Sequence, residues 1–267
     1  MKILIYIYIF IIGACFGSFF NVVGLRISDG KSIIRPRSSC PKCGHELSFW
    51  ELIPILNFFI LGGKCRKCKT RISTKYVLFE IVTAMLFVYS YYMFGFCGDF
   101  FISLLLISLI VIISVSDLEY MLIEDKVIFF FLIVFLILRI FIKLPSDFST
   151  FGLPTYVESL IGGAFGFGLL YWIAFIGRKV YNQEVMGGGD IKLYGIIGLV
   201  IGVKMTFISL LFASILGTII GLTLSGLKII KRDNPIPFGP FIGLGSLCTY
   251  FYGYDILHWY LNLFWNM

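Results

Sequence analysis

The sequence predicts an all-α polytopic membrane protein with about eight transmembrane helices and a small cytoplasmic, zinc-ribbon-like insertion between helices 1 and 2. Of the 267 residues, 59% are hydrophobic and only 14% are charged. A soluble domain of this length could not bury so much apolar surface. The apolar residues also form blocks, and a helix needs roughly 20 of them to cross about 30 Å of hydrocarbon. Two Cys-x-x-Cys pairs stand in a basic loop after the first block.

Eight apolar blocks follow one another along the chain. They cover residues 3–25, 76–97, 100–116, 127–142, 160–176, 191–203, 207–227 and 241–264. The blocks are continuously apolar rather than alternating, and an open sheet cannot satisfy its backbone in lipid, so we expect helices. The block at 191–203 is short, and we expect it to tilt or to lie shallowly. The predicted organisation is a first transmembrane helix at 1–25, a cytoplasmic four-cysteine domain at 26–75 and a transmembrane helical bundle at 76–267.

The basic residues predict the orientation of these spans. Residues 26–75 contain 11 Lys and Arg against Asp29, Glu46 and Glu51, which places this loop in the cytoplasm and the N-terminus outside. Beyond the loop, the residues that the same topology places inside are Lys126, Arg178, Lys179, Lys192, Lys228, Lys231 and Arg232. Those that fall toward the outer side are Lys2, Arg139, Lys143 and Lys204. The topology thus accounts for the net charge of +7, and we expect a lipid bilayer and no nucleic acid as partner.

The insertion contains the pairs Cys40-Pro-Lys-Cys43 and Cys65-Arg-Lys-Cys68. Two such pairs about 20 residues apart supply four thiolates in the spacing of a tetrahedral zinc ribbon. Disulfides are the alternative, but a cytoplasmic location argues against them. A domain of this size has too little core to fold firmly alone, and a metal would stabilise it. Four thiolates leave no open coordination position, so we predict a structural zinc site.

Acidic residues in a membrane bundle are candidates for function. Asp117 ends the third apolar block, and Asp190 enters the sixth through Met186-Gly-Gly-Gly. The topology places both aspartates at the cytoplasmic face, where they can meet across the bundle. Glu80, just inside the second block, could pair with a basic neighbour such as Lys75 or Arg71, or could line a site.

Two aspartates in a low-dielectric cleft cannot both ionise easily, so Asp117 and Asp190 could together activate water and protonate a leaving amine. The run Gly187, Gly188 and Gly189 would let an extended substrate approach closely and makes positive φ angles available. The alternatives are a turn with an N-cap at Asp190, a helix end at Asp117 that reaches toward water, and a proton-coupled transporter, whose carboxylates we would expect nearer the midplane.

With these residues identified, the chain resembles the type IV prepilin leader peptidases, the bifunctional peptidase/N-methyltransferase group. The resemblance runs over nearly the whole length. It rests on residues 13–23, 39–68, 76–80, 117–125 and the Gly187-Gly-Gly-Asp190-Ile-Lys-Leu segment, which matches a G-x-G-D motif. The same motif resembles that of presenilin-type intramembrane proteases.

The resemblance implies a membrane aspartyl endopeptidase in the bacterial cytoplasmic (inner) membrane, with its active site facing the cytoplasm. It would cut prepilins or pseudopilins after a glycine and then methylate the new N-terminus with S-adenosylmethionine. Asp117 and Asp190 carry over as the catalytic pair. The resemblance assigns no residues to the methyl donor, and no Gly-rich nucleotide loop follows a strand.

One position departs from the family's pattern. Proline commonly precedes the second aspartate of the first motif, whereas Glu124 precedes Asp125 here. Asp125 is therefore a rival of Asp117 as the partner of Asp190, and we favour Asp117 because it directly ends a span. Two other functions stay open from the sequence: a peptidase that does not methylate, and a transporter with a structural zinc domain.

Overall fold

The computed structural model describes residues 2–143, 145, 148–184, 186–227 and 236–265. Lys228, Lys231 and Arg232, which the predicted topology places inside, lie outside the described residues. Eight α-helices and one short 3-10 helix, η1, account for the regular structure of the described residues. Their bounds are α1 Lys2–Ser28, η1 Phe49–Leu52, α2 Leu56–Ile60, α3 Thr74–Phe94, α4 Gly98–Tyr120, α5 Asp125–Phe141, α6 Thr155–Tyr181, α7 Gly188–Gly226 and α8 Gly239–Trp265. The predicted all-α class is therefore confirmed.

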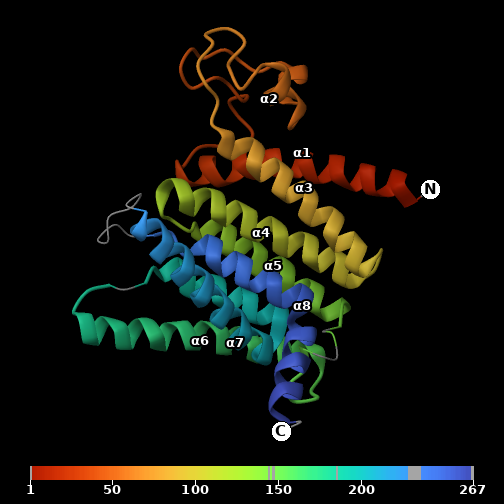
Figure 1. Cartoon of the computed structure of the whole chain (residues 1–267), viewed down its shortest axis with the longest axis vertical. Helices are drawn as coiled ribbons and strands as arrows, with labels where there is room; N and C mark the ends of the chain where they lie inside the picture. The colour runs from red at the N-terminus through yellow and green to blue at the C-terminus, as the bar shows by residue number, and fades with distance from the viewer. Residues whose placement is uncertain (1, 144, 146–147, 185, 228–235, 266–267) are drawn as a thin grey trace.

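The long helices pack side by side into one bundle, and the loop between α1 and α3 stands beside it (Figure 1). By length and composition, α1, α3, α4, α6 and α7 could each cross a membrane. Helix α4 lies at the centre of the bundle, and 78% of its most apolar 18-residue stretch is buried. By contrast, α1, α3 and α6 expose much of their apolar surface, as expected of helices that face lipid.

Helix α7 reverses direction at Gly202. This glycine has φ 74° and ψ 176°, a conformation that side chains disfavour. A side chain on Gly166 of α6 would meet both the Tyr194 carbonyl before the break and Thr206 after it, so the two halves of α7 lie side by side. Both ends of α7 accordingly lie at the same side of the bundle (Figure 1). The predicted blocks 191–203 and 207–227 are these two halves, which brings the long apolar segments to eight.

A buried arginine stabilises this reversal. The side chain of Arg139 in α5 is 2% exposed, and its guanidinium donates to the carbonyl oxygen of Val200, two residues before the break. It also donates to the carbonyl oxygen of Lys143 at 3.3 Å. A helix break leaves carbonyl groups without their intrahelical donors, and the guanidinium supplies one.

Glycines allow α6 to approach α7 closely. A side chain on Gly162 would overlap the carbonyl group of Gly198, and one on Gly198 would overlap that of Gly162. Small residues at such crossings bring helix backbones into contact in membranes, where the hydrophobic effect does not drive association. This contact fixes the first half of α7, and with it the position of Asp190.

Candidate active site and metal centre

The two cysteine pairs form two turns with the same hydrogen bonds. In the first turn, the Cys40 amide donates to the His45 carbonyl and the Gly44 amide donates to the Cys40 carbonyl, both at 2.9 Å. In the second, the Cys65 amide donates to the Thr70 carbonyl at 2.8 Å and the Lys69 amide to the Cys65 carbonyl at 3.0 Å. Gly44 and Lys69 also occupy equivalent positions with positive φ angles of 69° and 58°. The two Cys-x-x-Cys pairs of the sequence thus form the same turn twice.

The four sulfur atoms of these turns converge. All lie within 4.8 Å of one another, with Cys40 and Cys68 separated by 3.7 Å and Cys43 and Cys65 by 4.0 Å. Four sulfurs at about 2.3 Å from one zinc ion would be about 3.8 Å apart in a tetrahedron. The predicted cluster is therefore formed, and its donor set fits zinc.

The electrostatics of the cluster also suit a cation. Hydrogen bonds from the Thr70 hydroxyl and amide lower the pKa of Cys68 to about 6. The backbone N–H groups of Cys43 and Lys42 lower the pKa of Cys40. The His45 amide acts in the same direction on Cys43, but desolvation and the three neighbouring sulfurs outweigh it and raise the pKa of Cys43 to about 11. A bound cation would offset the repulsion that makes the last thiol hard to ionise.

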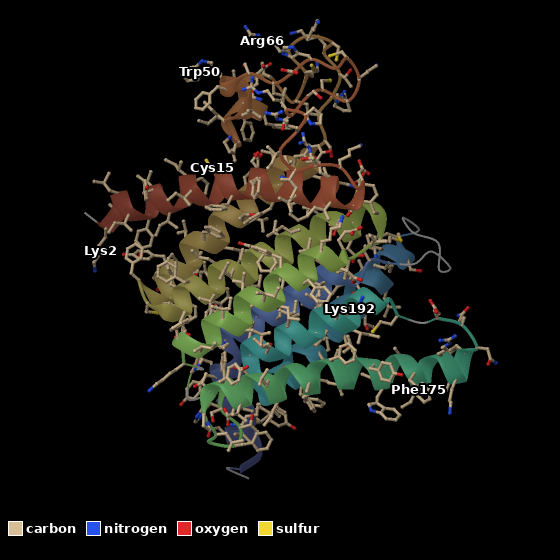
Figure 2. The ribbon with its side chains drawn as sticks, turned by 180° about the vertical axis from the view of Figure 1, so that it is seen from behind. Lys2, Cys15, Trp50, Arg66, Phe175 and Lys192 are labelled. Carbon is tan, nitrogen blue, oxygen red and sulfur yellow. The ribbon has the colours of Figure 1, made fainter. Side chains whose placement is uncertain are left out.

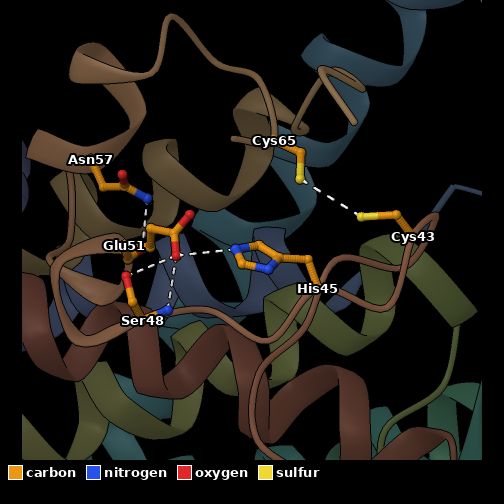
Figure 3. A network of polar contacts seen from close by, with 6 residues as sticks. All are labelled: Cys43, His45, Ser48, Glu51, Asn57 and Cys65. Atoms are coloured by element: carbon orange, nitrogen blue, oxygen red, sulfur yellow. Dashed lines mark hydrogen bonds and ion pairs between the residues drawn. The ribbon is translucent and has the colours of Figure 1, made fainter. Parts of the chain in front are cut away.

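A carboxylate network joins the first cysteine turn to η1 (Figure 3). Glu51 accepts hydrogen bonds from the Ser48 amide at 2.9 Å and hydroxyl at 2.8 Å, and His45 Nε2 lies 3.4 Å from the same oxygen. These Ser48 donors hold the pKa of Glu51 below its usual range. The side-chain amide of Asn57 donates to the backbone carbonyl of Glu51 at 2.6 Å, which joins α2 to the same network.

Asp117 lies in the last turn of α4 and is 6% exposed. Its Oδ2 accepts a hydrogen bond of 2.8 Å from the backbone amide of Gly239, the first residue of α8. The α4 helix ends at Tyr120, and Met121 follows with a left-handed φ of 52° and donates its amide to the Asp117 carbonyl at 2.9 Å. Asp117 is thus fixed through both its backbone and its side chain.

Asp190 is the third residue of α7 and is half-buried. The N-cap of this helix is Gly187, whose carbonyl accepts the Asp190 amide at 3.2 Å, so Asp190 is not the N-cap itself. The start of α7 packs on the turn that follows α4, because a side chain on Gly189 would lie 2.6 Å from Cβ of Ile123. The two predicted aspartates therefore lie on the same side of the bundle, close enough for the charge of Asp117 to act on Asp190, although 73 positions separate them in the sequence.

The glycine run before Asp190 differs from the expectation in one respect. None of Gly187, Gly188 and Gly189 adopts a positive φ, so their role is not to make a left-handed turn. Gly189 is needed for packing, because a side chain there would lie 2.6 Å from Cβ of Ile123. Gly188 faces open space next to the aspartates.

Asp125 lies in a different environment from Asp117. It opens α5, and its Oδ1 forms an ion pair of 2.6 Å with Lys192 Nζ. The side chain of Asp125 is 60% exposed and that of Lys192 is 44% exposed. A solvated ion pair suits a surface link between α5 and α7 better than a proton-transfer site.

Sequence reasoning missed Gly239 and left Glu80 undecided. Gly239 stands in a Pro-Phe-Gly-Pro turn before an apolar block, and this helix-start signal does not reveal that its amide reaches Asp117. The Glu80 carboxylate accepts a hydrogen bond of 2.8 Å from the backbone amide of Ile55. Its partner is therefore the backbone of the insertion and not a basic side chain. The basic neighbour Lys75 pairs instead with Glu119 at 3.0 Å.

Comparisons with known proteins agree with this arrangement. Residues 104–222 match the type IV leader peptidase family, and residues 11–94 match the bacterial peptidase A24 N-terminal domain. No solved structure matches significantly.

Three similar relatives are each named prepilin leader peptidase/N-methyltransferase. The one from Bacillus subtilis (strain 168) is 38% identical, over 96% of this chain and 97% of its own length. The relative from Myxococcus xanthus is 33% identical over 81% of this chain and 62% of its own length. That from Pseudomonas aeruginosa is 32% identical over 86% of this chain and 77% of its own length. The chain therefore belongs to the type IV leader peptidase family.

Proposed function

We propose that this protein is a membrane aspartyl endopeptidase that removes the leader of prepilins or pseudopilins and then methylates the new N-terminal amine. One observation carries the peptidase assignment: the buried carboxyl of Asp117, at the end of α4, and the half-buried carboxyl of Asp190, at the start of α7, lie on the same side of the bundle, close enough for the charge of one to act on the other. The names of the family members supply the substrate class and the second activity.

The pair has the chemistry that amide hydrolysis requires. One aspartate takes a proton from water as the water oxygen attacks the scissile carbonyl carbon. The other gives its proton to the leaving nitrogen as the C–N bond breaks, so no covalent enzyme intermediate forms. The first residue of α8 donates its backbone N–H to Asp117, and Asp190 lies in the first turn of α7. Helix N-termini favour the single negative charge that the pair would share.

The charges around the site support a cytoplasmic orientation. Lys75, Lys126 and Lys192 lie at the same helix ends as the two aspartates, and basic residues flank membrane spans on the cytoplasmic side. We therefore infer that the active site faces the cytoplasm in a bacterial inner membrane. A substrate would approach over Gly188, where nothing blocks an extended backbone.

For the metal centre we propose a structural zinc ion held by Cys40, Cys43, Cys65 and Cys68. Bound there, it would hold the two cysteine turns together and leave no position for substrate. The lack of an open coordination position separates this centre from the hydrolytic chemistry.

For the methyl transfer we propose S-adenosylmethionine as the donor, from the second activity in the relatives' names. The groove between α1 and the 49–56 segment is lined by apolar side chains and Cys15. It lacks the charged and amide partners that a nucleoside and an amino-acid group need. We therefore assign no residue to this donor and derive no step through it.

Purified enzyme in lipid vesicles, given a prepilin with and without S-adenosylmethionine, tests both activities. We expect mass spectrometry to find the shortened chain in both cases, and one added methyl group only when the donor is present. Complete cleavage with an unmodified amine in both cases would overturn the methylation assignment. An uncut prepilin would overturn the peptidase assignment.

A further inference from the structure

The segment of residues 49–60 in the insertion exposes an unusual number of large apolar side chains. We call these six side chains the 49–60 patch: Phe49 (74% exposed), Trp50 (74%), Leu52 (42%), Leu56 (59%), Phe59 (66%) and Ile60 (79%). They come from η1 and α2, which are too short to cross a membrane. A contiguous apolar surface of this kind in water would favour association. In the folded insertion, we therefore expect another apolar surface to cover the patch.

A hydrogen bond to a buried carboxylate fixes the depth of the patch relative to the bundle. The Ile55 amide, in the middle of the segment, donates to Glu80 Oε2 at 2.8 Å. Glu80 is 9% exposed and lies six residues after Thr74, the first residue of α3, which is about 9 Å into that helix. The segment thus lies beside the membrane spans rather than beyond their ends.

Contacts with α1 agree with this depth. Phe10, Ile11, Ala14 and Cys15 line a groove of about 420 Å³ together with residues 49 and 52–56. A side chain on Gly17 would lie 2.9 Å from Cα of Glu80, so Cys15, two residues away on α1, is only about 3 Å along the helix axis from the level of Glu80. Trp50 lies level with Cys15 along α1, whereas Arg66 lies at the far end of the insertion (Figure 2).

The patch continues an exposed apolar surface and carries a basic border. On α1, the exposed fractions are 55% for Ile11, 47% for Phe16 and 50% for Phe19, as expected of a helix that faces acyl chains. Residues 26–75 carry 11 basic against 3 acidic side chains, a net charge of +8. Basic segments beside membrane spans are attracted to anionic headgroups.

We propose that the 49–60 patch is embedded in the acyl region of the cytoplasmic leaflet, next to α1, while the basic cysteine turns lie at the anionic headgroups. The choice of leaflet rests on the orientation proposed above. In this arrangement η1 and α2 form a re-entrant anchor, and aromatic side chains such as Phe49 and Trp50 favour the boundary between lipid and water. The anchor holds the metal centre against the membrane surface, and Glu80 sets its depth.

Depth-dependent quenching of Trp50 tests the anchor. In a variant with Trp172→Phe, Trp259→Phe and Trp265→Phe, Trp50 is the remaining tryptophan. The protein is placed in vesicles of phosphatidylcholine and phosphatidylglycerol, with bromine at a shallow, middle or deep acyl position. We expect shallow or middle bromines to remove most of the Trp50 emission and aqueous acrylamide to remove little.

Two matched variants calibrate the measurement. One retains Trp172 instead, which is 60% exposed on α6 and should report lipid contact within a span. The other lacks all four tryptophans and carries Arg66→Trp at the exposed tip of the insertion, where acrylamide should quench more strongly, and middle bromines less strongly, than they quench Trp50.

Trp50 emission that follows the Arg66→Trp pattern would overturn the proposal, because the patch would then lie in water. Protection of Trp50 from both quenchers would also overturn it, because a second copy or another protein would then cover the patch. Prepilin cleavage by the same variants is measured separately. Loss of cleavage with Trp50 in lipid counts against the proposed function alone, and cleavage with Trp50 in water counts against the anchor alone.

Discussion

The substitution Gly239→Ala tests how the chain positions Asp117. A Cβ at this position would lie 2.7 Å from Asp117 Oδ2 and 3.3 Å from Cγ2 of Ile113. Ordinary contact begins near 3.4 Å, so the carboxyl group must retreat by about 0.7 Å. The 2.8 Å hydrogen bond from the Gly239 amide would be stretched beyond its useful range by this movement.

The expected loss of activity follows from that displacement. A hydrogen bond to a charged group contributes about 1.5–3 kcal/mol, and a misplacement of about 1 Å costs roughly 100-fold in rate. We therefore expect kcat/KM for prepilin cleavage by Gly239→Ala to fall by about 10- to 100-fold. The assay is the initial rate of leader release by enzyme in vesicles, with the thermal unfolding midpoint measured on the same preparation.

The control is Gly168→Ala in α6, where a new Cβ meets nothing within 4 Å. This variant should cleave at the wild-type rate, because alanine is at least as compatible with a helix as glycine. If Gly239→Ala is folded and cleaves as fast as Gly168→Ala, the amide of α8 does not position the catalytic carboxyl.

Other substitutions test the metal centre and the glycine run. Wild-type protein should contain about one zinc ion per chain. The double variant Cys40→Ser, Cys65→Ser should lose this zinc, and trypsin should then cut residues 26–75 while the bundle stays intact. An unchanged zinc content in the double variant would contradict the proposed site. Gly189→Ala should lower the cleavage rate by about 10-fold or more, since its Cβ displaces Ile123 beside the site. Gly168→Ala, whose Cβ meets nothing within 4 Å and lies away from the site, should cleave at the wild-type rate. Equal rates for the two glycine variants would refute the packing role.

The arrangement of spans could be predicted because lipid imposes a simple constraint. Each crossing needs one long apolar helix, so the eight apolar blocks follow directly from composition along the chain. The reversal of chain direction within α7 could not be predicted. Blocks 191–203 and 207–227 are separated by polar signals, but the reversal depends on one glycine, Gly202, and on Arg139 from another helix.

The candidate site, too, could be predicted only in part. Asp117 and Asp190 could be predicted as a pair because topology alone places both at one face. The donor to Asp117 could not be predicted, because Gly239 lies 122 positions away and contributes only its backbone. The sequence predicts the 49–60 segment only as part of the cytoplasmic four-cysteine domain at 26–75. Its contact with Glu80 depends on the tertiary fold.

The central claim is that Asp117 and Asp190 together form the catalytic pair and that Asp125 does not belong to it. The most direct measurement compares prepilin cleavage by Asp117→Asn, Asp190→Asn and Asp125→Asn, each co-expressed with the same substrate at matched protein levels. We expect the first two to release no detectable leader, because neither retains two carboxyl groups to exchange a proton with water and the leaving amine. Asp125→Asn should cleave at close to the wild-type rate, since it loses only an exposed ion pair with Lys192. Normal cleavage by Asp117→Asn, with loss in Asp125→Asn, would contradict the assignment.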